Sequence, residues 1–128
     1  MADFSKIKWE IEEVPNNDEI YMRVHRQFFR DGELRPNAFR DHEGSISTNW
    51  QKYSTPQATL CQGKNPPDNG ILSMNVGRIR NCHILSVIHA PDIPMRNRAH
   101  TNVFGQKNTE VRLHLRRISN VLIMPEAQ

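Results

Sequence analysis

Two histidines enclose the stretch of this sequence that is best equipped for chemistry. His89 and His100 bracket ten residues that include two prolines and two arginines, Arg96 and Arg98. A neutral histidine can act as a general base and a protonated one as a general acid, while arginine stabilises developing negative charge. This combination favours a site that takes a phosphate or phosphodiester group.

The two histidines meet only if the residues beside the loop form a hairpin in one register. With strands over 83–89 and 99–105, pairing His89 with His100 places their Cβ atoms about 5 Å apart. A shift of one residue sends them to opposite faces of the sheet. The prolines restrict the unfolded chain and so hold the loop arginines near the strand ends. The predicted catalytic residues are His89 and His100, and the predicted binding residues are Arg96, Arg98, Asn97, Asn102, Arg23 and Arg35.

A plainer interpretation of both histidines stays open, in which each is a strand-end residue bonded to backbone or water. A metal site has less support. His83 could join the two histidines as a third ligand, but neither H-E-x-x-H nor H-x-x-E-H spacing is present. Cys61 and Cys82 are too far apart for a CxxC pair, so we expect two free thiols. No metal or cofactor is expected.

The elements that must position these residues are mostly strands. Alternating apolar and polar residues between turn signals predict them. End signals predict two helices, the first capped by Ser54 or Thr55 with Pro56 at its first position, the second capped by Asn108 or Thr109. The predicted strands cover 4–14, 19–28, 45–50, 71–76, 83–89, 99–105 and 121–124, and the predicted helices cover 54–63 and 108–119. Most connections are too short for parallel crossovers. We therefore predict an α+β fold, a single compact domain over 1–128 with a mainly antiparallel sheet of five to seven strands and two short helices on one face.

The net charge of +3 is unevenly distributed. Residues 1–19 carry six acids and two lysines, a charge of −4, whereas residues 20–128 carry fifteen bases and eight acids, a charge of +7. Twelve of the seventeen bases are arginine, whose planar fork matches phosphate and carboxylate. An anionic partner is indicated: nucleic acid, a nucleotide or an acidic protein surface. A solvated basic surface, with the acidic segment 1–17 at its periphery, fits the same numbers.

Two further patterns bear on the partner and the compartment. Arginine and phenylalanine interleave between Arg23 and Arg40, as on surfaces that bind single-stranded nucleic acid. The phenylalanines would equally belong to a core with the arginines around it. No apolar run is long enough to cross a membrane and no secretory signal is recognisable, so we expect a cytoplasmic protein without a membrane partner.

The segments MRVHRQF, RPNAF, SIST and NRAHTNVFG, which span roughly residues 20–120, resemble a diffuse family of small uncharacterised bacterial proteins. That resemblance implies one compact fold and no particular activity. A weaker likeness is to the ADP-ribosyltransferases, with Arg23, residues 45–48 and Glu110 in the places of that family's arginine, Ser-Thr-Ser strand and glutamate. The serine motif is incomplete, and Glu110 falls in a predicted helix rather than in a strand.

Two functions follow from these patterns. The first is a small soluble module that binds an anionic partner through a face of histidine and arginine. The second is a small enzyme that acts on a phosphate-bearing or nucleotide substrate, by phosphodiester or ADP-ribosyl chemistry, at His89 and His100. A cleft in which the histidines and arginines converge would favour the enzyme, and a flat basic face with the histidines apart would favour binding.

Overall fold

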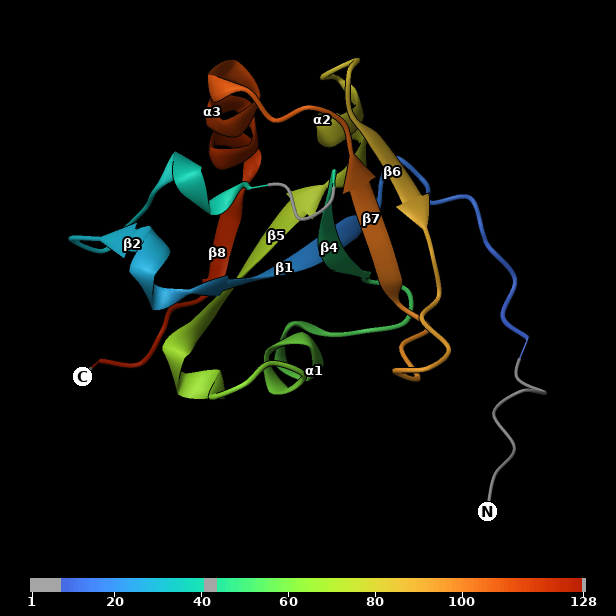
Figure 1. The fold of residues 1–128 in the computed structure, drawn as a ribbon, viewed down its shortest axis with the longest axis horizontal. Helices are drawn as coiled ribbons and strands as arrows, with labels where there is room; N and C mark the ends of the chain where they lie inside the picture. Colours follow the sequence, from blue (N-terminus) through green and yellow to red (C-terminus); the bar gives the residue numbers. More distant parts are fainter. Residues whose placement is uncertain (1–7, 41–43, 128) are drawn as a thin grey trace.

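A six-stranded antiparallel sheet forms the centre of the fold, with its strands in the order β6-β7-β4-β1-β5-β8 (Figure 1). The computed structural model describes residues 8–40 and 44–127. The six strands are β1 (Glu19–His25), β4 (Ser45–Trp50), β5 (Asn69–Asn75), β6 (Ser86–His89), β7 (His100–Phe104) and β8 (Asn120–Ile123). A separate two-stranded sheet pairs β2 (Phe29–Arg30) with β3 (Glu33–Leu34). The predicted α+β class is confirmed.

Within the described residues, three α-helices and three 3₁₀ turns complete the fold. They are α1 (Pro56–Cys61), α2 (Val76–Arg80) and α3 (Thr109–Ile118), with the turns η2 (Arg26–Phe28), η3 (Pro36–Ala38) and η4 (Pro66–Asp68). Both predicted helices exist and begin at predicted caps, since Thr55 Oγ1 accepts a hydrogen bond from Ala58 N and Asn108 Oδ1 accepts one from Val111 N. In the part of the chain that the structure describes, no helix is both long and apolar enough to cross a membrane.

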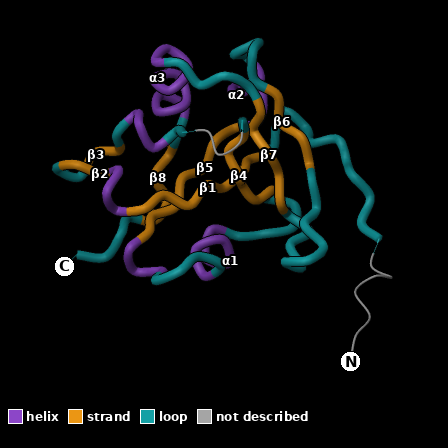
Figure 2. The backbone as a smooth tube through the Cα atoms, viewed as in Figure 1, coloured by secondary structure: helices purple, strands orange, loops and turns teal. Residues whose placement is uncertain are grey.

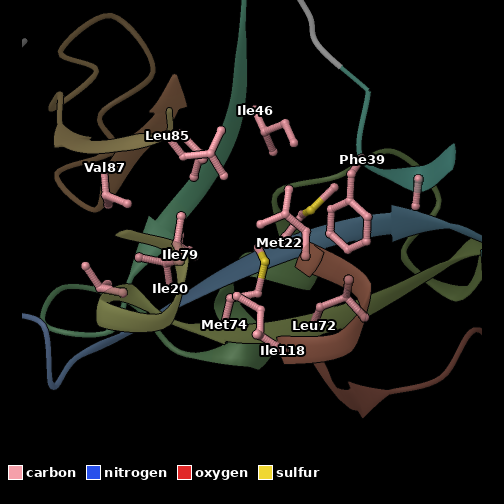
Figure 3. Packing of buried hydrophobic residues seen from close by; sticks show 14 of the residues in the cluster. Ile20, Met22, Phe39, Ile46, Leu72, Met74, Ile79, Leu85, Val87 and Ile118 are labelled. Carbon is pink, nitrogen blue, oxygen red and sulfur yellow. The ribbon is translucent and has the colours of Figure 1, made fainter. Parts of the chain in front are cut away.

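The helices cover both faces of the sheet (Figure 2). On one face Tyr21 and Ile71 form a small buried cluster with Leu60 of α1. The larger core lies on the other face beneath α2 and α3, where Ile20, Met22, Leu72 and Met74 pack (Figure 3). The expectation that the two predicted helices share one face is therefore wrong. The reason is β5, whose first six residues are buried, so that the strand needs cover on both sides.

Several strand boundaries differ from the prediction; β1, for example, ends at His25, and residues 26–28 form η2. The connection between the predicted strands 71–76 and 83–89 contains helix α2, because the Asn75 side chain accepts a hydrogen bond from Arg78 N and caps it. Strand β6 consequently starts at Ser86 instead of residue 83. The predicted strand over 4–14 is absent from residues 8–14, and its residues 4–7 lie outside the described residues.

The acidic N-terminal segment is tied to the domain over residues 8–18. Val14 is only 1% exposed and belongs to the core. Arg80 Nη1 donates to the Val14 carbonyl at 2.6 Å and to Asn16 Oδ1 at 2.7 Å. Glu12 forms an ion pair with Lys52 and accepts a hydrogen bond from the Tyr53 hydroxyl. This part of the segment therefore contributes to the packed domain instead of lying loosely at its edge.

Candidate functional site

His89 and His100 do not face one another, and the predicted pairing is wrong by one residue. In the β6–β7 hairpin His89 pairs with Thr101, and Val87 pairs with Val103. All four of these residues are buried and lie on the face of the larger core. Because side chains alternate along a strand, His100 lies on the opposite face. The core fixes this register, since the alternative would bring His100 into it and expose Val103.

His89 is a structural residue that is 1% exposed. Its Nδ1 accepts a hydrogen bond from Glu12 N at 3.0 Å, and its Nε2 lies 2.7 Å from the Arg98 carbonyl oxygen. A carbonyl oxygen only accepts, so Nε2 carries the proton and the ring is neutral. The rings of Trp50 and Tyr53 pack against it, with centroids 5.0 and 6.0 Å away. Both nitrogens are thus occupied by backbone, and the two-histidine catalytic site has no geometry to support it.

The two loop arginines lie in the connection between β6 and β7. Arg98 stacks its guanidinium over the Tyr53 ring, 4.2 Å from the centroid. Arg96 occupies the loop turn with a φ of 55°. Asn97 instead turns inward, and its Nδ2 donates to Asn49 Oδ1 at 2.8 Å. Of the predicted loop residues between the histidines, Asn97 is therefore the one placed beside His100.

A polar pocket opens on the α1 face of the sheet where β1 and β4 diverge. These two strands pair at Ile20 with Trp50 and at Tyr21 with Asn49. Beyond that point β1 continues along β5 while β4 continues along β7, and a pocket of about 130 Å³ lies between them. It is lined by Tyr21, Arg23, Ser47, Thr48, Asn49, Thr59, Gln62, Asn97 and His100. Of these, Arg23, Asn97 and His100 are among the predicted site residues.

Arg23 supplies the positive charge of the pocket. Its Nη1 donates to the Thr59 carbonyl of α1 at 3.0 Å, and its aliphatic stem crosses closely over Gly63. The side chain remains accessible to solvent, yet its surroundings partly desolvate the guanidinium and lower its pKa from the ordinary value. Burial likewise raises the pKa of Tyr21 on the same strand. Among the nine described residues that line the pocket, none is acidic.

His100 connects the pocket wall to the hairpin. Its Nδ1 lies 2.8 Å from the Ala90 carbonyl oxygen, and its Nε2 lies 3.3 Å from Ser47 Oγ. Ser47 is exposed in the middle of β4 and pairs with Asn102 on β7. The predicted residue Asn102 therefore lies next to Ser47 on the same face of the sheet.

An amide network shapes the rest of the pocket. Asn49 is buried, and its Nδ2 donates to Thr59 Oγ1 at 3.0 Å and to Gln62 Oε1 at 2.9 Å. With the bond from Asn97, the Asn49 amide therefore joins β4 to α1 and to the loop before β7. Such a connected network holds side chains in fixed orientations.

Sequence reasoning missed Ser47, Tyr21, Asn49, Thr59 and Gln62. The alternation within 19–25 and 45–50 places Tyr21 with Arg23, and Ser47 with Asn49, on one face of each strand. Nothing local shows that the two strands are neighbours. The weaker family likeness had paired Arg23 with residues 45–48, and Arg23 and Ser47 do line the same pocket. Glu110 lies in the first turn of α3, which packs on the opposite face.

The remaining predicted residue, Arg35, lies far from this pocket. It lines a shallow hollow of about 300 Å³ between η3 and α3, together with Arg112. The interleaved phenylalanines mostly serve the core: Phe39 is fully buried, and Phe28 and Phe29 pack against it. They therefore form no exposed stacking row, and the predicted single-stranded nucleic-acid surface loses its aromatic component.

Within residues 8–40 and 44–127, no three side chains of histidine, cysteine, aspartate or glutamate gather where they could hold a metal ion. Comparison with protein-family models, curated proteins and solved structures found no match for this chain. Fold and site together define an α+β domain with a small polar pocket, whose lining among the described residues includes one arginine, Arg23.

Proposed function

We propose that this protein binds a small phosphate-bearing ligand, a nucleotide in particular, whose phosphate group sits beside Arg23 and His100. The observation that carries the proposal is the character of the pocket. With His100 neutral, Arg23 is the one charged side chain among the described residues that line the pocket. The other lining side chains supply amides and hydroxyls, and none is a carboxylate. This is the anion-binding module expected from the sequence, with a different set of residues at its centre.

The electrostatics of Arg23 favour an anion. Partial desolvation lowers its pKa, which means that the folded protein disfavours the cation compared with water. Its hydrogen bond goes to a neutral carbonyl, and it has no ion pair with a carboxylate of the described residues. A bound phosphate would supply the missing opposite charge. The bond to Thr59 uses one of the five guanidinium N–H groups, so a fork remains for a bidentate oxyanion.

The size of the pocket and the surface beside it favour a nucleotide. A volume of about 130 Å³ is smaller than the roughly 300–1,000 Å³ of sites that enclose a whole ligand, so the pocket suits one phosphate group. Beside it, Ile88 pairs with Asn102 and Phe104 pairs with Ser45, and both apolar side chains are exposed, by 45% and 39%. A base lying on Phe104 would gain the stacking energy that aromatic side chains give to nucleobases.

Calorimetric titration with orthophosphate, adenosine monophosphate and adenosine tests this assignment. The wild type should bind the monophosphate more tightly than orthophosphate, and adenosine alone weakly. Arg23→Gln should lose at least tenfold in affinity for both phosphates, whereas Arg117→Gln, which removes the same charge from an exposed position on α3, should bind as the wild type does.

Phe104→Ala separates the two parts of the site. It should weaken binding of the monophosphate and leave orthophosphate unchanged. A wild type that binds neither phosphate at millimolar concentration and low salt would overturn the proposal. Tight, steeply salt-dependent binding of a single-stranded oligonucleotide that is insensitive to Arg23→Gln would replace it with the broader basic-surface hypothesis.

A further inference from the structure

The pocket holds a hydroxyl, an imidazole and a carbonyl in one hydrogen-bonded line. Ser47 Oγ lies 3.3 Å from His100 Nε2, and His100 Nδ1 lies 2.8 Å from the Ala90 carbonyl oxygen. We propose that Ser47 is a nucleophile activated by His100, and that together they cleave phosphate monoesters bound at Arg23. This inference rests on the proposed phosphate site and adds a reaction to it.

The Ala90 carbonyl decides which nitrogen of His100 can accept a proton. A carbonyl oxygen has no hydrogen to give, so the bond at 2.8 Å requires the proton on Nδ1. In the neutral ring Nε2 is then an acceptor, and the Ser47 hydroxyl donates to it. This is the arrangement that a serine nucleophile needs, with a base beside the hydroxyl and a third group that orients the base.

The end of the hairpin fixes the imidazole in this position. Ala90 N donates to the His100 carbonyl at 2.9 Å, so the two residues lie opposite each other where β6 and β7 part. In a regular antiparallel ladder the Ala90 carbonyl would accept a hydrogen bond from the His100 backbone N–H. Here it accepts one from the His100 ring N–H instead. The His100 backbone N–H points to the Asn97 carbonyl oxygen, with N and O 3.4 Å apart. The ring therefore replaces a backbone donor at the end of the strand.

Ser47 is placed where a phosphoryl group would sit. It projects from β4 on the α1 face, and it shares the lining of the pocket with Arg23 across the gap between β4 and β1. A phosphate held by the Arg23 fork consequently lies beside Oγ. Asn102, which pairs with Ser47 on β7, lies on the same face of the sheet but is not among the residues that line the pocket. Positioning and charge stabilisation are the main requirements of phosphoryl transfer.

The reaction balances with water as the second substrate. Ser47 Oγ attacks phosphorus while His100 Nε2 takes the serine proton, and the bond between phosphorus and the ester oxygen breaks on the side away from the serine. The departing oxygen takes a proton from solvent water. A second water molecule then attacks the phosphoserine from that side and releases a proton to solvent, while His100 returns its proton to Ser47 Oγ. The products are one alcohol and one orthophosphate, and His100 acts as base in the first step and as acid in the second.

Hydrolysis of p-nitrophenyl phosphate by the full chain, followed with intact-protein mass spectrometry after acid quenching, tests the proposal. Ser47→Ala and His100→Gln should each lower the rate by about 10²- to 10⁴-fold, and the quenched wild type should carry one phosphoryl group on Ser47. Ser45→Ala is the matched control. Ser45 lies two residues before Ser47 on the same strand and is not among the residues that line the pocket. It should react like the wild type.

Orthophosphate titration of Ser47→Ala separates the two proposals. The variant should bind phosphate as the wild type does while being inactive. If the wild type binds phosphate but shows neither turnover nor phosphoserine, the proposed role of Ser47 as nucleophile is overturned and the proposed binding site stands. Turnover that survives Ser47→Ala would also overturn it. Absence of phosphate binding by the wild type would overturn the binding site and the reaction that rests on it.

Discussion

Gly63 controls the position of Arg23, and a methyl group there should disable the anion site without unfolding the protein. A Cβ atom at Gly63 would lie 2.4 Å from Arg23 Cδ and 2.5 Å from Arg23 Nε. Carbon atoms pack at about 3.5–4.0 Å, so the side chain must move by about 1 Å. The bond from Nη1 to the Thr59 carbonyl, 3.0 Å long, cannot survive that shift unchanged.

The expected loss follows from the contacts that Arg23 would make. Displacing its guanidinium removes charge-assisted hydrogen bonds to the phosphate, and such bonds contribute about 1.5–3 kcal/mol. Gly63→Ala should therefore raise the Kd for orthophosphate by roughly ten- to a hundredfold in calorimetric titration. Gly63 has no positive φ, unlike Gly32, Gly44 and Gly105, so alanine is conformationally acceptable there. The Tm should stay within a few degrees of the wild type.

A double-mutant cycle shows whether the effect runs through Arg23. In an Arg23→Gln background, which shortens the side chain and removes the charge, Gly63→Ala should have no further effect on phosphate affinity. An undiminished affinity in the single Gly63→Ala variant would refute the reasoning. So would an equal loss in both backgrounds, because the methyl group would then act on some other part of the pocket.

Three further predictions concern stability. His89→Ala leaves two backbone groups without partners and should lower the Tm by on the order of 10 °C, whereas the exposed control His83→Ala should change it little; equal effects in scanning calorimetry would contradict the structural role. Hydrogen bonds from Lys52 and then Tyr53 lower the pKa of Glu12, so its stabilisation is present above the ordinary value of 4.5 and is lost as pH falls through the folded value. Glu12→Gln should therefore show a smaller loss of urea-unfolding stability between about pH 6 and pH 3, and parallel curves would count against this linkage. Gly105→Ala should cost at least about 2 kcal/mol, since φ is +125° and the new Cβ would lie 2.2 Å from the Ile84 carbonyl oxygen; an unchanged urea midpoint would show that the backbone can relax there.

Local signals were sufficient where an element is specified by its own residues. Thr55 and Asn108 cap their helices, each being one of the two residues expected there, and Pro56 opens α1 at its first position. The strand at 45–50 was predicted with its observed bounds. Caps and alternation act over a few residues, so the sequence carries them in readable form. The α+β class and the antiparallel sheet followed from the same local information together with the short connections.

By itself, then, the sequence determined most of the strands of the sheet, the helices α1 and α3, the class of fold and the excess of arginine. Only the tertiary structure decided which groups act together. The register of β6 against β7 depends on burying Val103, and that choice turned His89 into a neutral core residue and placed His100 on the opposite face. The pocket itself exists because β1 and β4 part after Tyr21 and each continues along a different neighbour. Such strand pairings join residues far apart in the chain, and the register that buries the most apolar side chains across the whole sheet is the one adopted. No short stretch of the sequence therefore shows which strands are neighbours or in which register they pair.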